Sequence, residues 1–335
     1  MGTRNTEATV KSDILVTRRI PEAGLDLLRE GAGVEVLPGD IEPTKQALLE
    51  KIRGRRGLLC LLTDPIDADV IAAGLGTLEV ISNYAVGYDN IDVAAATAAG
   101  IPVGNTPGVL TETTADLAFS LLMSSARRIV EGAAFARAGK WRSWSPTLLL
   151  GRDVHGATLG ILGMGRIGRA MARRATGFGM KIIYFDPDVE GEPDDLPGKP
   201  VSLDELAARS DFLSIHAPLN GETRGLVDAR FMASMKREAI LINTARGGLV
   251  DQDALVEALT DGVIGGAALD VTEPEPLPAD HPLYSLPDCI IVPHLGSASV
   301  ATRDRMAVMA AQNLLAGLNG ERLPHCVNPE VYRGS

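Results

Sequence analysis

An arginine, a glutamate and a histidine stand in three separate segments of the 335-residue sequence, each at or just after the end of an apolar run. Arg246 follows AILIN (239–243), Glu275 follows GGAALDV (265–271), and His294 ends CIIVPH (289–294). An arginine can hold a carboxylate through paired, charge-assisted hydrogen bonds and polarise an adjacent ketone. A histidine can donate a proton to a developing alkoxide, and a neighbouring carboxylate can orient the ring and stabilise its protonated form. The three side chains suit reduction of a 2-keto acid by hydride, if the fold brings them together.

A glycine-rich segment, ILGMGRIG (161–168), has the spacing Gly163-x-Gly165-x-x-Gly168. The spacing alone is weak evidence, but here it follows the predicted strand TLGIL and opens a predicted helix, which is the context that dinucleotide binding requires. Gly163 permits a tight turn, Gly165 allows the backbone to approach a pyrophosphate, and Gly168 allows the helix to pack on the strand. The N–H groups at the start of the helix, at Arg166 and Ile167, are available to phosphates.

An acidic residue also stands where a dinucleotide site needs one. Asp186 lies at the end of KIIYF (181–185), 18 residues after Gly168. A carboxylate there accepts hydrogen bonds from ribose hydroxyls and repels a 2′-phosphate. More acidic residues follow, and no lysine or arginine occurs before Lys199. The segment predicts NAD(H) in preference to NADP(H).

Singly, Arg246 could be a helix cap, Glu275 a solvated side chain and His294 a strand-end residue. Their occurrence together with a dinucleotide motif favours a catalytic role.

The elements that would position these residues are short strands alternating with helices. Strands are predicted in the first hundred residues at 13–17, 34–37, 58–62, 79–85 and 101–105. A long helical stretch (111–141) follows, and strands are then predicted at 158–162, 181–185, 211–217, 239–243, 265–271 and 289–294, before a final amphipathic helix at 299–321. A helix between successive strands implies parallel pairing with right-handed crossovers.

The position of the glycine motif in mid-chain predicts two α/β domains, each a doubly wound parallel sheet. Residues 107–297 are expected to form a Rossmann dinucleotide-binding domain, inserted into a substrate domain made of residues 1–106 and 298–335. Ligands of open α/β sheets bind beyond the carboxyl ends of the strands. Arg246, Glu275 and His294 are expected to converge at that edge.

Composition argues against several other functions. The net charge is −11 with no cluster of lysine or arginine, so nucleic-acid binding is not expected. No run approaches the roughly 18 apolar residues that a membrane span needs. The three cysteines, Cys60, Cys289 and Cys326, lie far apart beside apolar runs, which indicates buried thiols in a reducing, cytoplasmic compartment. No metal site is expected, since the remaining histidines lack metal-ligand spacing.

Motifs along residues 13–330 resemble those of the D-isomer-specific 2-hydroxyacid dehydrogenase family, in particular its glyoxylate/hydroxypyruvate reductase branch. The matching stretches are NYAVGYDNIDV, TPGVLTETTADLAFSLL, LGMGRIG, HAPLNGETRGLV, INTARGGLVD, ALDVTEPEPLPADHPL and PHLGSAS. The resemblance implies a flavodoxin-like substrate domain, a homodimer, and Arg246, Glu275 and His294 as the catalytic set. It also implies that the backbone N–H groups of Val86 and Gly87 bind the substrate carboxylate, with Ser297 near the pocket.

The resemblance further implies a set of cofactor contacts and a role for a tryptophan. The contacts beyond the glycine motif and Asp186 are Thr114, His216, Ala217, Pro218, Thr223, Thr244, Ala245, Arg246, Asp270, His294 and Gly296. His216 is expected to line the cofactor rather than to act on the ketone. Trp141 and Trp144 match the branch, in which one such tryptophan reaches the partner subunit's substrate pocket; alternatively, both anchor the loop after the long helix.

The expected activity is reduction of glyoxylate or hydroxypyruvate to the D-2-hydroxy acid, with NADH as the donor and His294 as the general acid. Members of the branch that prefer NADPH carry arginine, or serine and arginine, where Asp186, Pro187 and Asp188 stand here. The alternatives are another dehydrogenase of the family, acting on 3-phosphoglycerate, D-lactate or phosphite, or a non-catalytic protein that senses NAD.

Overall fold

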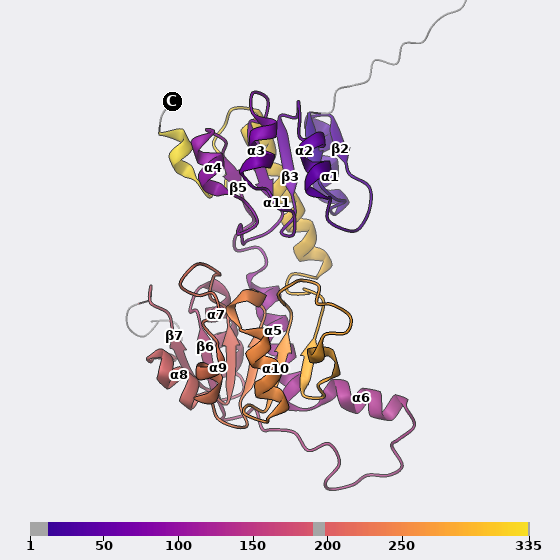
Figure 1. The fold of residues 1–335 in the computed structure, drawn as a ribbon, viewed down its shortest axis with the longest axis vertical. Coiled ribbons are helices and arrows are strands. Elements are labelled where there is room, and N and C mark those ends of the chain that lie inside the picture. The colour runs from indigo at the N-terminus through magenta and orange to yellow at the C-terminus, as the bar shows by residue number, and fades with distance from the viewer. Residues whose placement is uncertain (1–12, 190–197, 334–335) are drawn as a thin grey trace, which may run out of the picture. The chain divides into compact units, whose positions relative to one another are not determined.

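The chain forms two units in a computed structural model that describes residues 13–189 and 198–333 (Figure 1). One unit comprises the chain up to residue 109 together with the chain from residue 299, and the other comprises residues 110–298. The sequence placed the boundaries at 106/107 and 297/298. The acidic residues of 190–195, which entered the argument for NAD(H), lie outside the described residues.

The first unit contains a five-stranded sheet in the order β2-β1-β3-β4-β5, with every pair parallel. The strands are β1 (Ile14–Val16), β2 (Val34–Val36), β3 (Gly57–Cys60), β4 (Val80–Asn83) and β5 (Val103–Gly104). This order is that of flavodoxin-like sheets, and it places the switch point at β1. The carboxyl ends of β1, β3 and β4 lead into the loops that carry the polar residues of this unit.

Helices cover both faces of this first sheet. Four come from the N-terminal segment, namely α1 (Glu22–Gly31), α2 (Lys45–Lys51), α3 (Ala68–Gly74) and α4 (Val93–Ala98), and the fifth is α11 (Val300–Leu318). Side chains of α2, α3 and α4 share one apolar cluster with the strands, whereas α11 packs on α1, β3 and β4. The two helices α1 and α11 approach closely, since a Cβ on Gly24 would lie 2.7 Å from the backbone of Ala307.

The second unit contains a seven-stranded parallel sheet in the order β12-β11-β10-β9-β6-β7-β8. The strands are β6 (Thr158–Leu162), β7 (Lys181–Phe185), β8 (Gly198–Pro200), β9 (Phe212–Ile215), β10 (Ile240–Asn243), β11 (Gly266–Leu269) and β12 (Cys289–Ile291). The strand order reverses around β6, so its carboxyl end is the switch point at which this class of sheet binds ligands. The expectation of two doubly wound parallel sheets is confirmed.

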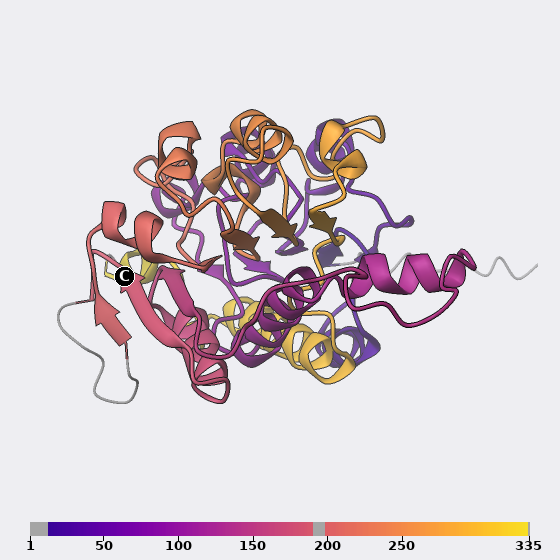
Figure 2. The same cartoon turned by 90° about the horizontal axis from the view of Figure 1, so that it is seen from below.

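Alternate residues of the second sheet feed two separate apolar cores. Ile240 and Ile242 of β10 pack with α5 (Thr111–Ala126) and α7 (Arg166–Thr176), whereas Leu241 packs on the opposite face. That face is covered by α8 (Leu203–Arg209), α9 (Ala229–Ala233) and α10 (Gln252–Thr260). Figure 2 shows the orange helices and the magenta ones on opposite sides of these strands. Both faces being buried explains why the strands are continuous apolar runs.

The long helical stretch predicted at 111–141 is interrupted in the structure. α5 ends at Ala126, and a second helix, α6, spans Ile129–Arg137. Arg128, between them, has φ 51°, a left-handed conformation that ends an α-helix. α5 has seven buried residues among its 16, whereas α6 contains no buried residue and extends away from the body of the unit (Figure 1).

Two further expectations can be compared with the described residues. Of the three thiols, Cys60 is fully buried and Cys289 and Cys326 are half-buried, and none forms a disulfide. Among the helices that the structure describes, none combines the length and the apolar character needed to cross a bilayer.

Candidate active site

The glycine motif forms a tight turn between β6 and α7. Gly163 has φ 95°, and a Cβ at this position would lie 2.6 Å from the backbone nitrogen of Ala217. A Cβ on Gly168 would lie 2.1 Å from the carbonyl oxygen of Gly163. Both positions therefore exclude any side chain on steric grounds. Gly165 differs, because its φ is −72° and a Cβ there would meet no atom within 4 Å.

Asp186 is held against this turn at the end of β7. Its Oδ2 accepts a hydrogen bond from the backbone N–H of Met164 at 2.7 Å, and its Oδ1 accepts one from Asp188 N–H at 3.0 Å. The carboxylate is half-buried. These contacts fix the carboxylate at the carboxyl edge of the sheet, one strand away from the glycine turn, which is where a ribose hydroxyl would have to be bound.

The residues around the turn fit a dinucleotide. Among the described residues, no side chain caps the N–H groups in the first turn of α7, and Gly165 leaves open space in front of them. Beyond β10, the buried hydroxyl oxygen of Thr244 has no hydrogen-bond partner within the described chain. A buried hydroxyl without a partner is unfavourable, so this atom is a natural contact for a ligand. Open backbone donors, a placed carboxylate and an unsatisfied hydroxyl are the parts that a nicotinamide dinucleotide needs.

His294 and Glu275 form a direct pair. His294 Nδ1 lies 2.6 Å from Glu275 Oε1, and their side chains are 23% and 31% exposed. The predicted strand 289–294 ends at Ile291, so His294 lies in the following turn, with φ 52°. A non-glycine residue rarely adopts this conformation, and its occurrence at a polar cluster is typical of functional sites. No residue in the described part of the chain hydrogen-bonds to Nε2 of His294, which leaves that atom open to a ligand.

Asp270 connects the loop of His294 to the end of β11. Its carboxylate accepts hydrogen bonds from the N–H groups of Leu295 (2.5 Å) and Gly296 (2.8 Å), and its carbonyl oxygen accepts one from His294 N–H at 3.0 Å. Burial raises the pKa of Asp270 to about 6, and the two backbone donors offset only part of that effect. The sequence indicated Asp270 as a cofactor contact, but not that it would hold this loop.

Arg246 follows β10 in a loop that a buried asparagine holds. Asn243, 1% exposed, donates through Nδ2 to the carbonyl oxygen of Arg246 at 2.8 Å and accepts through Oδ1 from Ala245 N–H at 3.0 Å. The backbone of Asn243 also accepts from Asp270 N–H at 2.8 Å. Sequence reasoning missed Asn243, although a polar residue that ends an otherwise apolar strand immediately before Arg246 was a visible signal.

The other predicted residues of this unit lie around the same edge. His216 and Ala217 follow β9 and contact the Gly163 turn, while Thr223 Oγ1 donates to the carbonyl oxygen of Pro218 at 2.6 Å. His216 Nε2 lies 2.8 Å from Ser214 Oγ, and burial lowers the pKa of this histidine to about 4. A Cβ on Gly296 would lie 3.4 Å from Thr114 Cγ2, so these two residues are neighbours. Ser297 is buried beside Gly296, and Arg166 is exposed at the start of α7.

Three predicted substrate contacts lie in other segments of the chain. Val86 and Gly87 belong to the first unit, in the loop after β4. Trp144 is 80% exposed in the segment after α6, and Trp141 is 65% exposed there. The sequence left open the alternative that the two rings anchor that segment. Their high exposure argues against it. A depression of about 1070 Å³ in the second unit, lined in part by Val130 and Tyr284, lies at the opposite, amino-terminal edge of the sheet.

Similar proteins are known both by sequence and by structure. Residues 119–296 match the sequence model of the D-isomer specific 2-hydroxyacid dehydrogenase NAD-binding domain. The chain is 50% identical over 329 residues to a glyoxylate reductase from Korarchaeum cryptofilum, covering 97% of this chain and 98% of that protein. A crystal structure of a protein from Thermus thermophilus matches with a TM-score of 0.88 and 52% identity, covering 94% of this chain and 99% of that one.

A second similar structure was determined with ligands bound. It is an NADPH-dependent glyoxylate/hydroxypyruvate reductase from Sinorhizobium meliloti in complex with NADP and malonate. It matches with a TM-score of 0.82 and 34% identity, covering 94% of this chain and 96% of that one.

Proposed function

The chain belongs to the D-isomer-specific 2-hydroxyacid dehydrogenase family, and on this premise we propose that it reduces glyoxylate or hydroxypyruvate to the corresponding D-2-hydroxy acid with NADH. The observation that carries the proposal is the 2.6 Å contact between His294 Nδ1 and Glu275 Oε1, which leaves Nε2 of the same ring without a partner in the described chain. A ring held in this way can present a proton at one defined atom.

Each residue has a separate task in this proposal. Glu275 accepts from Nδ1 and stabilises the protonated imidazole, so that Nε2 donates its proton to the oxygen of the reacting carbonyl. Arg246 binds the substrate carboxylate and polarises the ketone. Thr244, Gly165 and the first turn of α7 hold the dinucleotide, together with Asp186. When bound, the nicotinamide supplies the hydride for the keto carbon.

The preference for NADH over NADPH rests on Asp186. Both of its oxygens accept backbone hydrogen bonds, which hold the carboxylate at the position proposed for the adenosine ribose. A 2′-phosphate placed there would be repelled, whereas two ribose hydroxyls would find an acceptor. The Sinorhizobium meliloti reductase is NADPH-dependent, so this fold does not by itself require NADH.

We infer that the protein acts as a homodimer that associates through α6. Ile129 and Val130 of this helix are 53% and 55% exposed, and Leu150, after it, is 66% exposed. Val130 and Leu150 also line the depression at the amino-terminal edge of the sheet. Apolar side chains gathered in this way mark an interaction surface, and a second copy of the chain offers the same residues in return.

A panel of 2-keto acids tests the activity. Oxidation of NADH or NADPH is followed at 340 nm with glyoxylate, hydroxypyruvate, pyruvate and 3-phosphohydroxypyruvate, each with both cofactors. The expected result is the highest kcat/KM for glyoxylate or hydroxypyruvate with NADH. Tight binding of NADH without turnover of any keto acid would contradict the proposal and favour a protein that senses NAD.

A further inference from the structure

The loop after β4 in the first unit has an unusual distribution of hydrogen bonds. Three successive carbonyl oxygens accept from groups elsewhere in the unit: Ala85 from Thr106 N–H at 2.8 Å, Val86 from Asn105 Nδ2 at 2.8 Å, and Gly87 from Asn83 Nδ2 at 2.9 Å. In contrast, the N–H groups of Val86, Gly87 and Tyr88 donate no hydrogen bond within residues 13–189 and 198–333.

This distribution fixes the direction of the N–H groups. In a planar trans peptide the N–H points away from the preceding C=O. Because the carbonyl of Ala85 is tied to Thr106, the N–H of Val86 must point the opposite way. The same argument directs the N–H of Gly87 away from Asn105. Successive backbone N–H groups without protein acceptors form a concave site for an anion.

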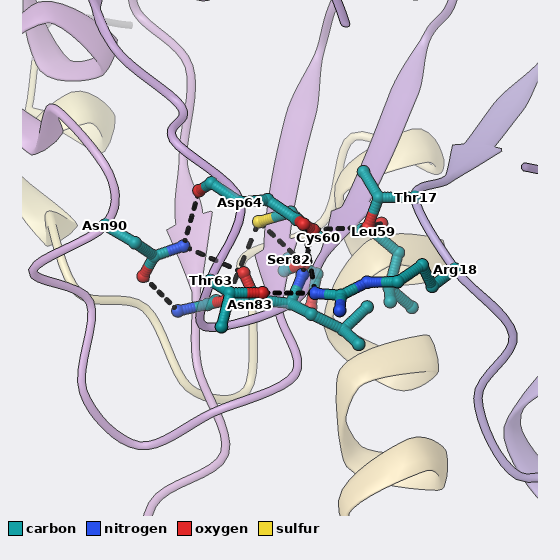
Figure 3. A network of polar contacts seen from close by, with 10 residues as sticks. Thr17, Arg18, Leu59, Cys60, Thr63, Asp64, Ser82, Asn83 and Asn90 are labelled. Carbon is teal, nitrogen blue, oxygen red and sulfur yellow. Dashed lines mark hydrogen bonds and ion pairs between the residues drawn. The ribbon is translucent and has the colours of Figure 1, made fainter. Parts of the chain in front are cut away.

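The amide of Asn83 is itself oriented by Asn90. Asn90 Nδ2 donates to the carbonyl oxygens of Leu61 (3.0 Å) and Asp64 (3.1 Å), which uses both of its hydrogens. Asn90 Oδ1 must therefore face Asn83, whose Nδ2 donates to it at 3.0 Å. Figure 3 shows the dashed lines that join Asn90 to Asp64 and to Asn83. This arrangement leaves the second hydrogen of Asn83 Nδ2 for the carbonyl of Gly87.

The loop after β3, whose carbonyl oxygens accept hydrogen bonds from Asn90, is anchored by a buried carboxylate. Asp64 has no exposed side-chain surface, and its carboxylate accepts hydrogen bonds from Thr17 Oγ1 (2.5 Å), Leu61 N–H (2.7 Å) and Arg18 Nη2 (3.1 Å). Arg18 also donates to Thr63, which lies in the same loop (Figure 3). On the other side, the backbone of Asn105 is bonded to Asn313 Nδ2 at 2.8 Å and to His325 at 3.2 Å.

We propose that Asn105 and Asn83 are positioning residues for the substrate carboxylate, because they hold the carbonyl groups of Val86 and Gly87 and thereby turn the N–H groups of Gly87 and Tyr88 outward. This inference rests on the proposed function, and it adds the N–H groups of this loop to Arg246 as ligands of the keto acid's carboxylate. Asn83 and Asn105 do not touch the substrate. They act by holding the carbonyl side of two peptide planes, so their loss affects substrate affinity first.

Isosteric variants test the proposal. Asn105→Asp and Asn83→Asp keep the shape of each side chain but replace the donor with a carboxylate oxygen that repels the carbonyl of Val86 or Gly87. The expected result is a rise of about tenfold to a hundredfold in KM for glyoxylate, the size of an effect on a hydrogen bond to a charged group. The value of kcat should change much less, and the dissociation constant of NADH should stay within about twofold.

Asn328→Asp is the matched control. Asn328 is fully buried in the first unit, as Asn83 is, and makes hydrogen bonds to Val103, Thr97 and Ile101, but none in the described residues to the loop after β4. This variant should lower stability without raising KM. An unchanged KM in folded Asn105→Asp and Asn83→Asp, or an equal rise in KM in Asn328→Asp, would overturn the proposal.

If the variants do not fold, a measurement on the wild-type protein still tests the proposal. Hydrogen exchange of residues 86–88 is compared in the NADH complex with and without oxalate, a dicarboxylate that cannot be reduced. Slower exchange with oxalate is expected, and unchanged exchange would overturn the proposal. If no keto acid is turned over, the proposed function fails instead, and oxalate binding to the wild type and both variants by calorimetry still decides whether the loop is an anion site.

Discussion

His294 is held in a backbone conformation that its side chain disfavours. At φ 52°, a residue with a Cβ is less stable than glycine by about 1–2 kcal/mol. The compensation is a ring placed at 2.6 Å from Glu275, in a turn that is bonded to Asp270. The position of the imidazole ring is therefore set by the backbone of this turn as much as by Glu275.

Two substitutions at His294 separate catalysis from strain. Both His294→Ala and His294→Gly should lower kcat by about a hundredfold to ten-thousandfold at saturating keto acid, because each removes the proton donor. His294→Gly should nevertheless be more stable than His294→Ala by about 1 kcal/mol, because glycine adopts this φ without strain. Turnover at 340 nm and urea unfolding measure the two effects. Near-normal turnover in either variant would contradict the assignment of the acid.

Replacement of Asp186 should change the choice of cofactor. The double variant Asp186→Ser, Pro187→Arg removes the repelling carboxylate and adds a cation for a 2′-phosphate. The ratio of kcat/KM for NADPH to that for NADH should rise by about tenfold or more. The single variant Pro187→Arg, which keeps the carboxylate, is the control. An unchanged ratio in the double variant would show that Asp186 does not read the ribose.

His216 should make the fold sensitive to acid. Its pKa is lowered to about 4 from an ordinary value of 6.5, because burial disfavours the charged ring. The neutral ring therefore contributes stability that is present above pH 6.5 and is lost as the pH falls toward 4. The loss is at most about 3 kcal/mol, since the ring retains partial exposure. Urea unfolding from pH 7 to 4 should show a shallower loss in His216→Asn, and no such change in the control His155→Asn, whose ring is exposed.

In the turn between β6 and α7, we expect Gly163 to be required for folding and Gly165 for cofactor binding. Gly163→Ala should lower the free energy of unfolding by about 1–3 kcal/mol, because φ is 95° and the Cβ would meet Ala217. Gly165→Ala should change stability by less than about 0.5 kcal/mol, since φ is ordinary and the space is open.

The same two variants distinguish an effect on folding from an effect on NADH binding. The Cβ of Gly165→Ala would occupy the space in front of the first turn of α7, so the dissociation constant of NADH should rise by about tenfold or more. Fluorescence titration measures it. Wild-type affinity in Gly165→Ala would mean that the pyrophosphate does not pass over this residue.

At the level of elements, apolar runs such as KIIYF (181–185) predicted strands closely because both faces of the sheet are buried. The break at Arg128 was not predictable, since nothing in the local sequence marks an arginine for a left-handed conformation. His294 was expected within a strand and lies beyond its end. Asn243 and Asp270 contact residues that are distant in sequence, and spacing alone does not report such contacts.

For the molecule as a whole, the exposed apolar surface of α6 predicts self-association. The variant Val130→Asp places a charge in that surface and should shift the protein toward a mass of 35.3 kDa, that of one chain, in light scattering across a dilution series. Leu75→Asp is the control, because Leu75 is equally exposed, at 56%, but lies in the first unit. An unchanged mass in Val130→Asp, or a wild type that is already monomeric, would contradict the predicted dimer.

The split of the first unit between the two ends of the chain was foreseeable from the place of the glycine motif. The sequence did not show which helix would cover the open face of the first sheet. α11 does so through Met306, Ala310 and Leu314, and it packs on α1, which lies about 280 residues earlier in the chain. This helix packing depends on two small residues, Gly24 and Ala307, that are far apart in the sequence. No local sequence pattern therefore predicts it.

The late arrival of α11 has a consequence for synthesis on the ribosome. The second unit is continuous from residue 110 to 298 and can fold as soon as it has emerged. The first unit begins to emerge earlier, but the face of α1, β3 and β4 that α11 covers stays exposed until residues 300–318 follow. For most of translation the nascent chain therefore carries an unshielded apolar surface, and holdase chaperones are expected to bind the N-terminal segment until its last helix is made.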